Sequence, residues 1–207
     1  MRIEEAIEQL DAMSAVAERS ATFSGLRASP VAATGLVGAL TACVQHVFIR
    51  HSAGANESAF AGQFISLWVA SASICLAIVL GDMWIRYLRE PTRRTRRLTL
   101  QVLGRLAPSF LAGSGITLVI MRHSTELAWT LPAWWATLLG LGICSALSLL
   151  PRCLRPVGAW YIGAGLLVLM LAKDAWALHP LSMAVPFVGG QLFTAWLITR
   201  DPEVGYR

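Results

Sequence analysis

The side chains best suited to chemistry in this sequence are histidines, because imidazole nitrogen binds zinc, copper and haem iron. All of them fall at one predicted edge of the apolar segments described below, namely His46, His51, His123 and His179. Three carboxylates are expected at the same edge: Glu57, Glu126 and Asp174. Only His46 and His51 are close in sequence, and a separation of five residues is poor for one helix face. A metal or haem site would therefore require several segments to converge, and histidines in contact with water or lipid headgroups are the simpler interpretation.

Motifs of common enzyme classes are missing from the sequence. It contains no HExxH, no phosphate-binding glycine loop, and no Ser-His-Asp or Cys-His arrangement at a plausible membrane depth. Its cysteines form no CxxC or CxxxC pair, so neither a disulfide framework nor a structural metal is indicated. We therefore expect a non-enzymatic protein without catalytic residues or a cofactor, and keep haem or metal at the histidines as an alternative.

The composition is that of a membrane protein. Of the 207 residues, 56% are hydrophobic and only 14% are charged, whereas about 25% are charged in soluble domains. The net charge of +5 would suggest nucleic acid as a partner of a soluble protein. Here the basic residues lie mainly between apolar segments, so membrane topology explains them and no nucleic acid is expected.

Six apolar segments are long enough to cross a bilayer. They cover residues 29–49, 60–85, 103–121, 131–150, 157–173 and 181–199. A helix rises about 1.5 Å per residue, so roughly 20 residues span about 30 Å of hydrocarbon. We predict an all-α, polytopic transmembrane bundle of about six helices over residues 28–200.

Basic residues fix the predicted orientation. One set of alternate connections contains 14 of them: Arg2, Arg19, Arg27, Arg86, Arg89, Arg93, Arg94, Arg96, Arg97, Arg105, Arg152, Arg155, Arg200 and Arg207. The other set contains 3: Arg50, Arg122 and Lys173. Because arginine and lysine concentrate on the cytoplasmic side, we expect both termini in the cytoplasm, including the tail 201–207.

Residues 1–27 are predicted to form a cytoplasmic amphipathic helix and a linker. Ile3, Ile7, Leu10, Met13 and Ala17 recur at helical spacing on one face, and the opposite face is acidic. Helices that lie on anionic lipid are usually basic. An acidic helix is a candidate contact for a protein partner, and a solvated cytoplasmic helix is the alternative.

Short outer loops would join the spans into three helical hairpins. Arg27-x-x-Pro30 before the first span resembles Arg105-x-x-Pro108 before the third in spacing. This similarity suggests a decayed triplication of one hairpin. The alternative is convergence, because arginine and proline are common at the inner ends of membrane helices.

Polar residues near the span ends provide three further candidate sites. Gln45 and His46 lie about one turn inside the outer boundary of the first span. Asp82 precedes Arg86 by four residues, a spacing at which helical side chains meet, so we predict a structural ion pair. Residues 86–105 contain seven arginines, which could bind anionic lipid or an acidic partner in addition to setting topology.

The sixth span is predicted to be distorted or closely packed. Pro186 lacks an N–H and crowds the carbonyl four residues earlier. Gly189 and Gly190 follow it directly, and small residues let membrane helices approach one another closely. This is also the one place where a helix could open its backbone beside a transport route.

The chain resembles a family of small six-span bacterial integral membrane proteins. The residues that carry the resemblance are Glu18, Arg19, Ser20, Thr22, Phe23, Leu131, Pro132, Trp135, Gly140, Pro156, Gly158, Gly189, Gly190, Ile198 and Arg200. Family members often have a histidine two residues after the paired glycines, whereas this chain has Leu192 there. The resemblance implies a six-helix fold in the bacterial cytoplasmic (inner) membrane and no assigned reaction.

Three function classes follow from these observations. We expect a non-enzymatic accessory or interaction component of the membrane. A small transporter or channel is the first alternative, although no charged residue lies deep in a span. A haem- or metal-associated redox protein that uses the outer histidines is the second.

Overall fold

The structure is a computed structural model that describes residues 27–49, 57–89, 93–172, 176 and 178–201. Most of the described residues are helical, and none of them forms a strand. Six of the helices are long and apolar enough to cross a membrane, which confirms the all-α fold with six candidate spans. The predicted N-terminal helix, the loop with His51 and the C-terminal tail lie outside the described residues.

The first three spans are nearly continuous helices. Helix α2 (Ala28–Val44) continues into the π-helix η1 (Gln45–Ile49), and it is followed by α3 (Glu57–Arg89) and α4 (Arg93–His123). Helix α4 begins well before the apolar segment predicted at residue 103. Its arginine-rich start is polar, so hydropathy alone could not reveal that the helix extends beyond the apolar segment.

The last three spans contain short irregular helices. A 3-10 helix, η3 (Thr125–Thr130), leads into α5 (Leu131–Ala146), and a second one, η4 (Arg152–Leu154), leads into α6 (Arg155–Leu171). The sixth span consists of α7 (Pro180–Met183), the π-helix η6 (Ala184–Val188) and α8 (Gly189–Arg200). Helix α5 ends four residues before the predicted limit at 150, because the chain turns ahead of Pro151.

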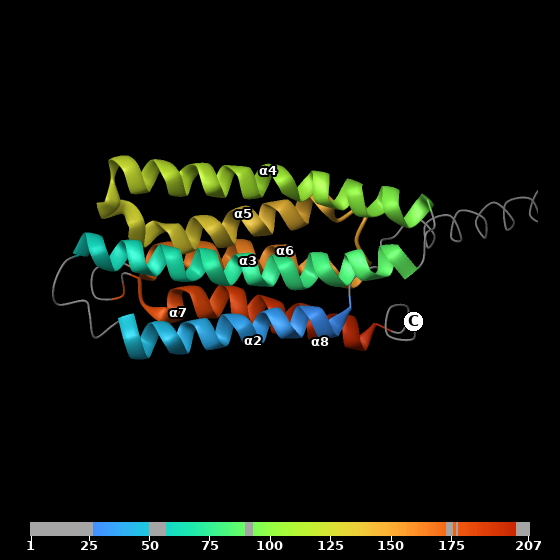
Figure 1. Cartoon of the computed structure of the whole chain (residues 1–207), viewed down its shortest axis with the longest axis horizontal. Coiled ribbons are helices and arrows are strands. Elements are labelled where there is room, and N and C mark those ends of the chain that lie inside the picture. Colours follow the sequence, from blue (N-terminus) through green and yellow to red (C-terminus); the bar gives the residue numbers. More distant parts are fainter. Residues whose placement is uncertain (1–26, 50–56, 90–92, 173–175, 177, 202–207) are drawn as a thin grey trace, which may run out of the picture.

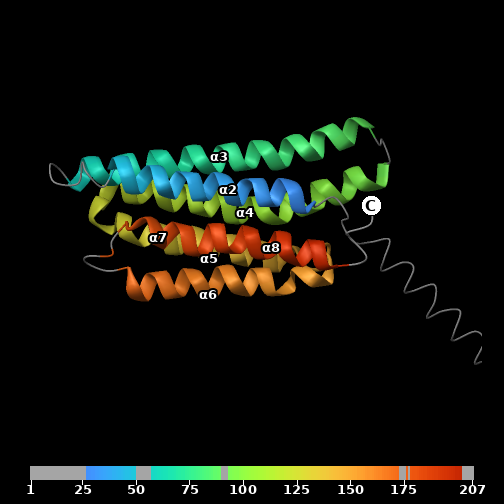
Figure 2. The same ribbon diagram turned by 90° about the horizontal axis from the view of Figure 1, so that it is seen from below.

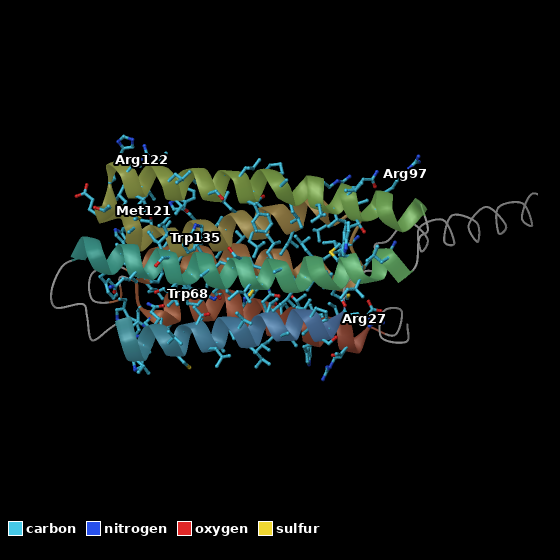
Figure 3. All side chains as sticks on the ribbon, viewed as in Figure 1. Arg27, Trp68, Arg97, Met121, Arg122 and Trp135 are labelled. Atoms are coloured by element: carbon cyan, nitrogen blue, oxygen red, sulfur yellow. The ribbon has the colours of Figure 1, made fainter. Side chains whose placement is uncertain are left out.

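The long helices run side by side along one direction, with α4 at one margin of the bundle (Figure 1) and α3 and α6 on opposite sides of it (Figure 2). Arg27 and Arg97 lie at one end, and Arg122 lies at the other (Figure 3). These three arginines therefore lie at the ends of the bundle, as residues that border a hydrocarbon layer should.

Glycines allow α5 and α6 to pack closely, and their contact is the most extensive between any two helices. A Cβ at Gly140 would lie 2.8 Å from the carbonyl oxygen of Gly158, and one at Gly165 would lie 2.9 Å from that of Ala133. Larger side chains at these positions would separate the two helices. The α5–α6 pair thus forms the most closely packed part of the bundle.

Spans that are consecutive in the sequence pack on each other, and so do spans that are far apart in the sequence. Helix α2 contacts α3 and, more extensively, α8, which joins the first span to the last. Helix α4 packs on α5 and makes little contact with α3. Since the α5–α6 contact joins two different predicted hairpins, the grouping into three hairpins remains a prediction.

Candidate functional site

The described histidines lie on different elements. His46 and His123 are exposed, on η1 and at the end of α4 respectively. His179 precedes α7, where its Nδ1 accepts a hydrogen bond of 3.2 Å from the backbone N–H of Leu181. No group of three His, Cys, Asp or Glu side chains that could hold a metal ion occurs among the described residues. His51 lies outside them.

Polar side chains instead gather between the first two spans. We name this set the polar seam, and it consists of Thr34, Thr41, Gln45, Trp68, Ser71 and Cys75. The first three recur on α2 and η1 at steps of seven and four residues, and the other three recur on α3 at steps of three and four. Such steps keep side chains on one helix face, so the two faces meet along the contact between the helices.

Gln45 forms one end of the polar seam and is only 2% exposed. Its Oε1 accepts a hydrogen bond of 2.8 Å from Trp68 Nε1. Its Nε2 donates one of 2.7 Å to the carbonyl oxygen of Leu178. Leu178 has a φ of 54°, a left-handed conformation that is uncommon for leucine. Gln45 thus connects the first span to the second and to the strained residue just before the sixth.

The seam continues toward the middle of the bundle. The Thr41 and Ser71 hydroxyls are joined by a hydrogen bond of 2.9 Å, and both side chains are buried. One turn further inward, the Cys75 thiol lies 3.7 Å from the carbonyl oxygen of Thr34, a weak interaction typical of thiols. The described hydrogen bonds therefore link α2 and α3 at three levels.

The sixth span departs from α-helical geometry beside this seam. Pro186 is buried inside η6, and its carbonyl oxygen accepts a hydrogen bond of 3.2 Å from Trp160 Nε1 of α6. A Cβ at Gly189 would lie 2.9 Å from the Trp160 ring, and one at Gly190 would overlap the Tyr161 ring. Two successive aromatic residues of α6 therefore fit against two successive glycines of α8. Sequence reasoning identified the glycines and the proline but not their aromatic partners.

Tyr161, which packs on Gly190, lies in the interior of the bundle. It is 1% exposed, and its ring centroid lies 5.9 Å from that of Phe187 in η6. Its hydroxyl has no hydrogen-bond partner among the described atoms. Buried tyrosine hydroxyls usually have one, so this atom is the unusual feature of the candidate site.

The predicted ion pair and arginine cluster are described only in part. Asp82 has an interaction partner, but the side chain of Arg86 lies outside the described residues, so the pair remains a prediction. Arg105 donates hydrogen bonds to the carbonyl oxygen of Ser145, at 3.1 Å, and to the Ser148 hydroxyl. This arginine of the cluster thus binds the C-terminal end of α5, where the helix dipole favours a cation.

The chain matches no family model, no curated protein and no solved structure.

Proposed function

We propose that the chain is a non-enzymatic interaction component of the bacterial cytoplasmic membrane, crossing it six times with both termini in the cytoplasm. The orientation is supported by the distribution of arginine and lysine along the sequence. The interaction role is supported by the open face of α4.

Helix α4 is the least covered of the six candidate spans, with 11% of its most apolar window buried. One face presents residues at steps of four, three, four and three: Gly104, Pro108, Leu111, Gly115 and Leu118. No side chain lies within 4 Å of a Cβ placed at Gly104 or Gly115. Small residues at such spacing let a second membrane helix approach closely. We therefore place the partner contact on this face.

Pro108 gives a second reason to expect a partner on α4, because it leaves a backbone carbonyl without its usual donor. A proline inside a helix cannot donate to the carbonyl four residues earlier, which belongs to Gly104. This carbonyl lies beside Arg105, near the inner end of the predicted span, and the missing side chain at Gly104 leaves it accessible. A hydroxyl or amide side chain of a partner helix could donate a hydrogen bond to it there, as water or a headgroup also could.

Photo-crosslinking in intact cells tests the contact. A photoreactive amino acid at Leu111, which is 73% exposed on α4, should give a discrete protein adduct. The matched control is Met170, which is 79% exposed on α6 and should react with lipid only. Gly115→Leu should abolish the adduct at Leu111. Identical products at the two positions would contradict the proposal.

Two further partners belong to this proposal. Residues 86–105 would bind anionic lipid headgroups through their arginines, and the acidic residues 1–27 would contact a cytoplasmic protein. A pull-down with and without residues 1–27 tests the second contact. Loss of the same partner from α4 variants and from the truncated chain would assign both contacts to one protein.

A small transporter is the second candidate, and the π-helix η6 supports it. Irregular backbone within a membrane occurs where it is covered by protein or lines a pathway, and π-helical segments are frequent at functional sites. Here η6 lies beside the polar seam. Stopped-flow light scattering of proteoliposomes under sucrose, glycerol and urea gradients tests this function. A permeability equal to that of empty liposomes would exclude a pathway for water and these solutes.

A further inference from the structure

Ser114 carries an exposed hydroxyl in the middle of the open face of α4. It lies nine residues after Arg105 and eight before Arg122, the two arginines that border the apolar part of this helix. At about 1.5 Å per residue, the hydroxyl is therefore roughly 12–14 Å from either border, near the centre of the hydrocarbon that α4 would cross. A polar group at this depth is unfavourable unless another group satisfies it.

The Ser114 side chain forms no hydrogen bond with any described residue. Other hydroxyls of the spans are paired. The exposed Ser73 of α3 donates a hydrogen bond of 2.8 Å to the carbonyl oxygen of Val69 in its own helix. Thr117, on the covered side of α4, accepts one of 2.9 Å from Trp135 Nε1 of α5. Ser114 thus keeps a donor and an acceptor on the exposed side of its helix.

Large apolar side chains flank Ser114 at helical spacing. Ala107, Leu111, Ser114 and Leu118 follow one another at steps of four, three and four residues, the spacing of a seam along which two helices pack. Leu111 is 73% exposed and Leu118 is 66% exposed. The face therefore suits a helix that meets it along its whole length.

Opposite charges lie at one end of this face. Arg122 belongs to the last turn of α4, and Glu126 follows four residues later in η3. Both are exposed, and neither forms an ion pair with another described residue. At the other end, the Arg105 guanidinium does not oppose a partner, because it bonds Ser145 and Ser148 of α5. A surface that carries both signs at one end can be complementary to a copy of itself.

We propose that the occupant of the α4 face is a second copy of this chain, bound through the same face about a twofold axis along the membrane normal. The inference rests on the proposed partner contact on α4 and names its partner. Both copies insert with the same orientation, so equal residues meet at equal depth. Ser114 then faces the partner's Ser114, and two hydroxyls satisfy each other because each can donate and accept. Arg122 pairs with the partner's Glu126, and the symmetry forms this pair twice.

Crosslinking between two differently tagged copies identifies the occupant. Both copies would carry the photoreactive amino acid at Leu111 and would be expressed together in intact cells. We expect an adduct that contains both tags. An adduct that contains only a different protein would overturn the second copy but leave the contact on α4 standing. Reaction with lipid alone, as expected at Met170, would overturn both.

Charge reversal tests the arrangement of the two copies. Energy transfer between labelled full-length chains in proteoliposomes would measure their association. Arg122→Glu and Glu126→Arg should each lower the association constant about fivefold, the loss expected for two exposed ion pairs. Mixed in equal amounts, the two variants should associate about as strongly as the parent, because residue 122 of each copy then meets an opposite charge at residue 126 of the other. A mixture that associates no better than the separate variants would overturn the twofold arrangement.

The same measurement tests the serine contact. Ser114→Ala should lower the association constant about threefold, the usual loss for a hydrogen bond between membrane helices. The matched control is Ser73→Ala, which removes an exposed hydroxyl that bonds its own helix and should leave association unchanged. Equal association constants for the two variants would overturn the pairing of Ser114 across the axis.

Discussion

The indole Nε1 of Trp68 donates a hydrogen bond of 2.8 Å to Oε1 of Gln45, which reaches the carbonyl oxygen of Leu178 through its Nε2 at 2.7 Å. One amide thus satisfies a donor from the second span and an acceptor from the segment before the sixth. Trp68 and Leu178 are both buried, and replacing the amide would leave the two groups unpaired. Gln45 is therefore expected to hold the outer end of the bundle together.

Gln45→Leu should destabilise the protein strongly. The change leaves Trp68 N–H and the Leu178 carbonyl without partners, and each orphaned group costs about 1–3 kcal/mol. His46→Leu is the matched control, since the adjacent His46 is exposed and its loss should cost little. Denaturation of the purified protein in detergent compares the two. Equal losses for the two variants would show that the bridge contributes no stability.

Reporter fusions should place residues 55 and 95 on opposite sides of the membrane, with residue 95 in the cytoplasm. The reason is the distribution of basic residues, which places 14 on one side and 3 on the other. A phosphatase reporter active only outside and a fluorescent reporter active only inside would be fused at each position. Both reporters giving the same side would refute the six-span topology.

Asp82 and Arg86 are expected to be coupled in a double-mutant cycle. Removing one partner leaves an isolated charge near the hydrocarbon, which is more unfavourable than removing both. Asp82→Ala and Arg86→Ala should therefore each cost more stability than the double variant. Additive losses of unfolding free energy would show that the two side chains do not pair.

Sequence reasoning identified the six spans because hydropathy is a local property. It also singled out Gln45 and His46 as polar residues inside a span boundary, but not which of them faces inward. That choice depends on η1, where the helix changes from α to π geometry at Gln45, and on partners supplied by residues 68 and 178. A single sequence reveals neither the change from α to π geometry nor which distant residues will be the partners of Gln45.

The metal or haem site at the histidines stays a prediction, because His51 lies outside the described residues. They share a predicted membrane edge, but depth alone does not bring side chains together. His123 lies at the end of α4, whereas the His179 ring packs against Trp176 with ring centroids 4.9 Å apart and planes inclined by 55°. Whether histidines from different spans approach one another depends on which helices are neighbours, and α4 packs mainly on α5. This neighbour relation is set by packing across the bundle, which one sequence does not reveal.

Gly190→Leu should disrupt folding. A Cβ at Gly190 already overlaps the Tyr161 ring, and that ring is fixed in the core by its neighbours, so overpacking cannot be relieved by a side-chain rotation. Gly163→Leu on α6 is the matched control, because nothing lies within 4 Å of a Cβ at that position. The yield of monodisperse protein in detergent and its thermal stability measure the difference.

The double variant Gly190→Leu with Tyr161→Ala separates close packing from a transport role for the same glycine. Removing the ring opens space for the leucine, so the double variant should recover part of the folded yield if packing is the reason for Gly190. If a pathway is the reason, Gly190→Leu alone should fold normally and block solute flux in proteoliposomes. A single variant that folds normally and leaves flux unchanged would contradict both explanations, and the contact between α6 and α8 would then have to tolerate a large side chain by moving apart.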